Sequence, residues 1–126
     1  MKQLQTIETY LLDLDGTFYL GDQLFPWSLP FVETMERLGK RFIFVTNNSS
    51  QNGNYYVEKI RKMGVNITPE QVFTAGQATI FYLKKYNYPK KLYLVGTPAL
   101  EEEFTEAGFI LTAEDPETIV LGFDMT

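Results

Sequence analysis

The chain has 126 residues, 44% of them hydrophobic, which is enough for a modest domain with a buried core. It contains no cysteine and no histidine, which excludes disulfides, thiolate nucleophiles, imidazole metal ligands and a Ser-His-Asp triad, and leaves acid–base chemistry mainly to carboxylates. The net charge of −5 is unevenly spread. Residues 1–91 contain all eleven Lys and Arg together with eight acidic residues, whereas residues 92–126 contain eight acidic residues and no basic one. A general nucleic-acid binder needs a basic face, so this distribution argues against one, and it indicates a change of structural unit between Asn87 and Lys91.

The amino-terminal residues do not have the form of a signal peptide, because Lys2, Gln3, Gln5 and Glu8 interrupt them. No apolar run approaches membrane-spanning length. We therefore expect a cytoplasmic protein with no membrane partner.

Apolar runs and helical patterns alternate along the chain, which predicts an α/β fold with a mainly parallel sheet. The runs Thr9–Leu14 and Phe42–Val45 are expected to form buried strands, the second covered on both faces because it is continuously apolar. Between them, residues 18–29 are expected to form a loop with a turn at Gly21-Asp22, and Ser28 to be the N-cap of the next helix. The remaining expected elements are helix 55–63, strand 72–74, helix 76–86, strand 92–95, helix 98–107 and strand 119–123.

Two local patterns mark the ends and faces of these elements. Thr68-Pro69-Glu70-Gln71 has the form of a capping box. The glutamates of the helix that follows Thr97 are expected to be its solvated face, and these are Glu101, Glu102, Glu103 and Glu106.

The first predicted strand leads directly into two carboxylates, Asp13 and Asp15, and Gly16 then allows the chain to turn. Because carboxylates resist burial, the strand should end here, at the carboxyl edge of the sheet, where open α/β sheets bind ligands. Two close carboxylates repel each other, and a hard cation such as Mg²⁺ relieves the repulsion. The alternative is a pair of solvated residues at a strand end. A calcium loop is excluded, because Phe18 and Leu24 stand where it needs glycine and a bidentate glutamate.

Polar residues also follow the second predicted strand: Thr46, Asn47 and Asn48. If the two strands are parallel neighbours, these residues lie beside Asp13 and Asp15. Hydroxyl, amide and backbone N–H groups hold phosphate oxygens, and the amino end of the next helix favours an anion. Taken alone, the loop is explained equally well by ordinary N-cap and turn chemistry.

Together, the motifs D-L-D-G-T-F-Y-L-G at residues 13–21 and F-I-F-V-T-N-N-S-S at residues 42–50 resemble the haloacid dehalogenase superfamily of phosphotransferases. The similarity is to its NagD-like, 4-nitrophenylphosphatase-like branch, and residues 92–96 and 120–124 also resemble that branch. The resemblance implies a Rossmann-like core. It also implies a Mg²⁺-dependent phosphoric monoester hydrolase that acts on a small phosphorylated metabolite through an aspartyl-phosphate.

The resemblance implies a role for each candidate residue. Asp13 matches the nucleophile, and Asp15 matches the general acid/base. Mg²⁺ would be held by a carboxylate oxygen of Asp13 and the backbone carbonyl of Asp15. The expected phosphate- and substrate-binding residues are Thr46, whose hydroxyl would bind the transferring phosphoryl group, with Asn47, Asn48 and Gly16.

The sequence departs from the family pattern in one respect. The family also uses a lysine against the phosphate and a later G-D-x-x-x-[ST]-D motif, and neither is present; no lysine follows Lys91. We therefore expect the amino-terminal part of a longer enzyme, with half of the catalytic core at residues 1–88 and the beginning of an inserted α/β cap at residues 89–126. Such a fragment is expected to be impaired in catalysis and to self-associate through uncovered strand edges. The alternative function is a non-catalytic module that binds a phosphorylated ligand or a partner chain.

Overall fold

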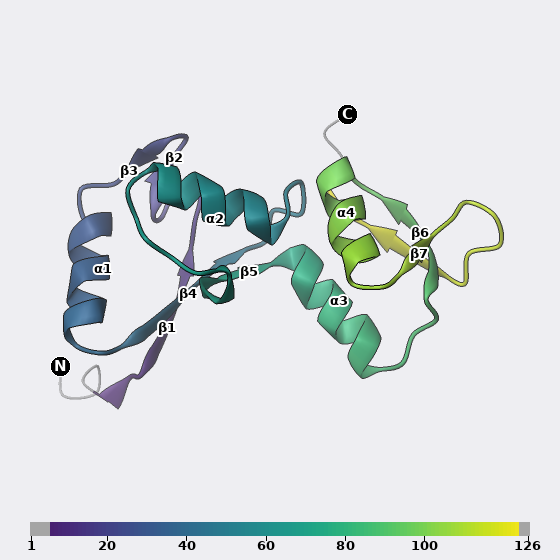
Figure 1. Ribbon diagram of the computed structural model, residues 1–126, viewed down its shortest axis with the longest axis horizontal. Helices are drawn as coiled ribbons and strands as arrows, with labels where there is room; N and C mark the ends of the chain where they lie inside the picture. The colour runs from purple at the N-terminus through teal and green to yellow at the C-terminus, as the bar shows by residue number, and fades with distance from the viewer. Residues whose placement is uncertain (1–5, 124–126) are drawn as a thin grey trace. The chain divides into compact units, whose positions relative to one another are not determined.

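The structure is a computed structural model that describes residues 6–123. Its strands and helices alternate as predicted, and contacts divide them into two compact units (Figure 1). Residues up to Thr46 and Tyr56–Phe73 form the first unit, and Asn47–Tyr55 and the residues from Thr74 onward form the second. The domain boundaries expected from the sequence remain a prediction, because contacts within this chain do not define the domains of a larger fold.

The first unit is built on a three-stranded sheet in the order β1-β4-β5. Strand β1 (Thr9–Asp13) runs parallel to β4 (Arg41–Thr46), and their register sets Asp13 opposite Val45. The carboxyl ends of these two strands therefore lie side by side. The other elements around this sheet are α1 (Ser28–Arg37), α2 (Gly53–Lys62), the 3₁₀ helix η2 (Pro69–Gln71), which carries the predicted capping box, and β5 (Val72–Thr74).

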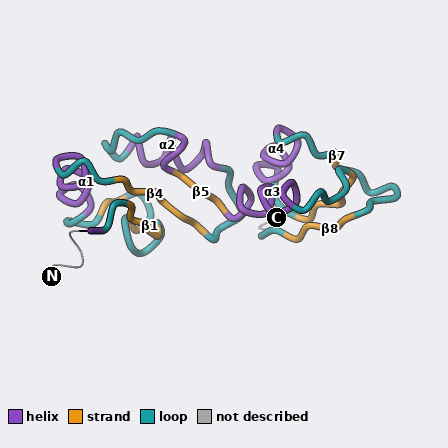
Figure 2. Tube along the Cα trace, turned by 90° about the horizontal axis from the view of Figure 1, so that it is seen from below, coloured by secondary structure: helices purple, strands orange, loops and turns teal. Residues whose placement is uncertain are grey.

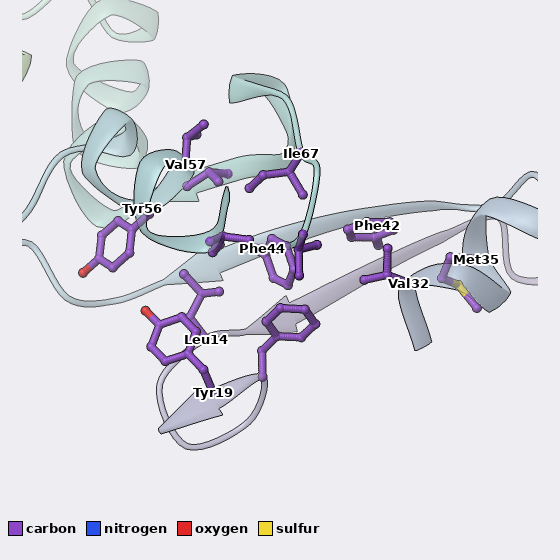
Figure 3. Close-up of a cluster of buried hydrophobic side chains, with 13 residues drawn as sticks. Leu14, Tyr19, Val32, Met35, Phe42, Phe44, Tyr56, Val57 and Ile67 are labelled. Carbon is purple, nitrogen blue, oxygen red and sulfur yellow. The ribbon is translucent and has the colours of Figure 1, made fainter. Parts of the chain in front are cut away.

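Alternate residues of β4 point into the core of the first unit. Phe42 and Phe44 are buried and gather with Leu14 and with side chains of the α2 region (Figure 3). On the other face of β4, Ile43 and Val45 are only partly buried. The prediction that this strand is buried on both faces is therefore wrong for the described unit, because side chains of a strand point alternately to two faces and the second face is only partly covered here.

The packing of β1 is equally one-sided: Leu14, directly after the strand, is 0% exposed, whereas Leu11 is 69% exposed. We expect Leu14→Ala to lower the free energy of unfolding by about 2–5 kcal/mol, because it leaves a cavity in the core. Leu20→Ala, the matched control at a leucine of the same unit that is 67% exposed, should change it by no more than about 0.5 kcal/mol. Chemical denaturation of both variants measures the difference, and equal losses would contradict this packing.

Residues 18–29, expected to form a loop, contain an antiparallel hairpin. Its strands, β2 (Tyr19–Leu20) and β3 (Gln23–Leu24), flank the predicted turn at Gly21-Asp22. Gly21 has a φ of +59°, a backbone conformation that glycine adopts without steric cost.

The predicted N-cap role of Ser28 is wrong. Helix α1 begins at Ser28 itself, after Trp27. Ser28 is fully buried, and its Oγ donates a hydrogen bond of 2.5 Å to the carbonyl of Phe18. The hydroxyl therefore fixes the preceding loop to the helix and does not cap it.

The second unit contains a parallel sheet in the order β7-β6-β8. Its strands are β6 (Lys91–Val95), β7 (Ile110–Leu111) and β8 (Thr118–Leu121), and its helices are α3 (Ala75–Lys85) and α4 (Pro98–Glu106). The helices lie on one side of β8 (Figure 2), where Leu83, Leu100 and Phe104 pack against buried strand residues. Strand β7 was not predicted. No helix among residues 6–123 has the length and apolar character needed to cross a membrane.

The glutamates of α4 are not all solvated. Glu101, Glu102 and Glu106 are exposed, as predicted. Glu103 is partly buried and hydrogen-bonded to two other segments of the second unit, so the prediction is wrong for this residue.

Candidate active site

The chain turns sharply after β1, and Leu14 anchors this turn. Its carbonyl accepts the backbone N–H groups of residues 17–19, at 3.2, 2.9 and 3.3 Å. Gly16 has a φ of +79°, which only glycine adopts readily, and so provides the bend that the sequence predicted. The turn leaves the side chains of Asp13 and Asp15 exposed on either side of a buried leucine.

Thr17 holds the Asp13 carboxylate and was not assigned a role from the sequence. Its Oγ1 donates a hydrogen bond to Asp13 Oδ2 at 3.2 Å, which restricts rotation of the carboxylate. The other carboxylate oxygen, Oδ1, takes no part in this bond. Neither Asp13 nor Asp15 forms an ion pair with any residue from 6 to 123. The Asp13 carboxylate is therefore oriented by a neutral donor, and neither aspartate is paired with a basic side chain within residues 6–123.

Strand pairing brings Thr46 to the same edge of the sheet. Because Asp13 pairs with Val45, Thr46 is the next residue of the neighbouring strand. It is 4% exposed. The first unit thus places three of the predicted site residues, Asp13, Asp15 and Thr46, at the carboxyl ends of two adjacent parallel strands.

The two predicted asparagines belong to the second unit. Asn47 is exposed, and Asn48 is partly buried. Asn48 Oδ1 accepts the N–H of Ser50 at 2.9 Å, the contact by which an asparagine closes a turn on its own backbone. The structure therefore gives Asn48 a loop-shaping contact, and its role toward phosphate stays a prediction.

The sheet edge offers hard oxygen donors to a cation. Asp13 supplies a carboxylate, and the carbonyl of Asp15 lies outside the hydrogen bonds that form the turn. These are ligand types that Mg²⁺ accepts, usually with several waters and one or two carboxylates. No group of three or more acidic side chains that could hold a metal occurs within residues 6–123. The donors present fit Mg²⁺ in kind, and they make up part of a ligand set.

The first unit has the architecture of a Rossmann-like α/β domain. Its parallel sheet carries two aspartates and a threonine at the carboxyl ends of neighbouring strands, which form an acidic site at that edge. The chain belongs to the haloacid dehalogenase-like hydrolases, whose family model matches residues 10–110. This confirms the family resemblance of the two motifs.

Several relatives of the chain in this family are named phosphatases. It is 33% identical over 125 residues to the acid sugar phosphatase of Staphylococcus aureus, an alignment that covers 98% of the chain and 47% of the relative. The solved structure of a 4-nitrophenylphosphatase from Thermotoga maritima is 45% identical with a TM-score of 0.94, over 98% of the chain and 47% of that protein. A glycerol phosphate phosphatase from Mycobacterium tuberculosis, solved in complex with magnesium, is 29% identical with a TM-score of 0.82, over 97% of the chain and 38% of that protein. The chain spans about half the length of the relatives it matches, or less.

Proposed function

We propose that this chain carries the nucleophile and the general acid of a Mg²⁺-dependent phosphatase that forms an aspartyl-phosphate on Asp13. The observation that supports this most is the meeting of Asp13, Asp15 and Thr46 at one edge of the parallel sheet. The membership in a hydrolase family and the phosphatase names of the relatives support the same reaction class.

In the first step, a carboxylate oxygen of Asp13 attacks phosphorus, and the bond from phosphorus to the ester oxygen breaks. The carboxyl group of Asp15 gives its proton to the departing oxygen. The hydrogen bond from Thr17 keeps the Asp13 carboxylate in one orientation, which lowers the entropic cost of the attack.

In the second step, the Asp15 carboxylate takes a proton from water as the water oxygen attacks phosphorus. The bond between phosphorus and Asp13 breaks, which releases inorganic phosphate and restores both side chains. The Thr46 hydroxyl donates to a phosphoryl oxygen in both steps, with Asn47, Asn48 and the Gly16 backbone as further phosphate contacts.

A bound Mg²⁺ would supply positive charge against the phosphoryl oxygens. The residues of this chain that would hold it are Asp13, through its carboxylate, and Asp15, through its backbone carbonyl. The family's lysine and second acidic motif are not among the 126 residues, so we propose that residues beyond them complete the site.

The substrate we propose is a small phosphate ester in the cytoplasm, in line with the sugar phosphate and glycerol phosphate named for two relatives. Assay of the full-length protein with 4-nitrophenyl phosphate tests the proposal. We expect release of 4-nitrophenolate with Mg²⁺ and its loss when EDTA removes the metal. Phosphate binding without turnover would instead support the non-catalytic module.

We further propose that the 126-residue chain self-associates through β1. Among the described residues this strand pairs only with β4, which makes it a sheet edge, and Leu11 is exposed on it. An open edge pairs readily with a strand of another chain. We expect light scattering across a dilution series to give a mass above that of the monomer, and Leu11→Lys to lower it. A monomeric mass at high micromolar concentration would contradict this.

A further inference from the structure

The loop that follows Thr46 is held at several points by the rest of the second unit. Three hydrogen bonds join residues 49–52 to residues 97–123, far along the chain. They run from Thr97 Oγ1 to the Ser50 carbonyl (2.9 Å), from the Phe123 N–H to Ser49 Oγ (2.7 Å) and from Asn52 Nδ2 to Glu102 Oε2 (2.9 Å).

Glu103 makes a further connection, at the point where the loop enters α2. Its Oε1 accepts the N–H of Gly53, the first residue of α2, at 3.2 Å. Thr74 Oγ1 donates to both oxygens of the same carboxylate, at 3.3 and 3.4 Å. Thr74 is 1% exposed and caps α3, where its Oγ1 accepts the N–H of Gln77. One carboxylate from α4 thus lies at the amino ends of two helices, where the helix dipoles favour negative charge.

The surroundings leave room for this carboxylate. A Cβ at position 76 would lie 2.0 Å from Glu103 Oε2 and 2.9 Å from Leu100 Cδ1, so Gly76 leaves the space that the carboxylate occupies. Burial raises the pKa of Glu103 above its usual value, although the hydrogen bonds from Gly53 and Thr74 act in the opposite direction. Keeping Glu103 charged therefore costs desolvation free energy, and the exposed glutamates of α4 remain solvated.

We propose that Glu103 is a positioning residue for the phosphate-binding loop. It fixes the Gly53 end of the loop to α3 and α4, and thereby holds Asn47–Gly53 in the conformation that receives the phosphoryl group. This inference rests on the proposed function, because it assigns Asn47 and Asn48 to the phosphate. Glu103 itself does not touch the substrate.

Amide hydrogen exchange on the 126-residue chain tests the contact. Glu103→Ala removes a charged hydrogen-bond acceptor, so the Gly53 amide should exchange at least about tenfold faster. Glu103→Gln keeps an acceptor oxygen for Gly53 but not the charge, so its Gly53 amide should exchange more slowly than that of Glu103→Ala. Glu101→Ala is the matched control, because Glu101 is exposed on the same helix and no hydrogen bond joins its side chain to the described loop residues. Glu103→Asp, one methylene shorter, replaces the alanine variant if that variant does not fold.

Titration of the full-length protein with inorganic phosphate in the presence of Mg²⁺, followed by the amide shifts of Asn47 and Asn48, tests the role. We expect about tenfold weaker affinity in Glu103→Ala, a smaller loss in Glu103→Gln, and wild-type affinity in Glu101→Ala. Unchanged exchange at Gly53 in Glu103→Ala would overturn the proposal, and so would faster exchange with unchanged phosphate affinity. If the full-length wild type does not bind phosphate, the proposed function fails, and the positioning role fails with it. The exchange data separately report whether the Glu103 contact holds the loop.

Discussion

Asp13→Asn should abolish phosphatase turnover in the full-length protein, by more than about 10⁴-fold, with the fold unchanged. An amide has nearly the shape of a carboxylate and is a far weaker nucleophile. Asp13 and its hydrogen bond from Thr17 are both exposed, so the substitution removes no buried interaction. Initial rates with 4-nitrophenyl phosphate measure the loss, and chemical denaturation checks the fold.

Asp22→Asn is the matched control for this experiment. Asp22 lies in the hairpin turn of the same unit, pairs with Lys59 at 3.8 Å and has no place in the proposed site. It should keep wild-type rates. Near-normal turnover in Asp13→Asn would remove Asp13 from the role of nucleophile.

Asp15→Asn should slow turnover by about 10²–10⁴-fold, because it removes the proton donor and leaves the backbone carbonyl in place. The loss should depend on the leaving group. An alkyl phosphate such as glycerol phosphate leaves as a strongly basic alkoxide that needs the proton, whereas 4-nitrophenolate is a stable anion.

Comparison of the two substrates therefore separates acid catalysis from a structural role. We expect a larger loss with glycerol phosphate than with 4-nitrophenyl phosphate. Equal losses would assign Asp15 to the shape of the turn, and unchanged rates would remove it from the mechanism.

Much of the fold follows from local pattern. Strands β1, β4, β5, β6 and β8 and the capping box at Thr68–Gln71 were predicted, because each is specified by neighbouring residues. Strands β2, β3 and β7 were missed, because two residues are too few to show an alternating pattern. Which face of a strand is buried depends on tertiary partners, so the exposure of Leu11 could not be predicted from its own run.

The residues of the candidate site could likewise be predicted only in part. Asp13, Asp15 and Thr46 were found because carboxylates and hydroxyls at strand ends are visible in the sequence. Thr17 was missed because its bond to Asp13 depends on the geometry of the turn. Glu103 was missed because a helical pattern does not show which of several glutamates meets a helix end 50 residues away.

The most direct test of the central claim is to trap the phosphorylated enzyme. Borohydride reduces an acyl phosphate to the alcohol, so an aspartyl-phosphate becomes homoserine, which mass spectrometry locates in a peptide map. In the full-length protein quenched during turnover of 4-nitrophenyl phosphate, we predict homoserine at position 13, and none when substrate is omitted. Homoserine at position 15, or an unmodified Asp13 under conditions that trap the acyl phosphate of a known aspartyl-phosphate enzyme, would contradict the account.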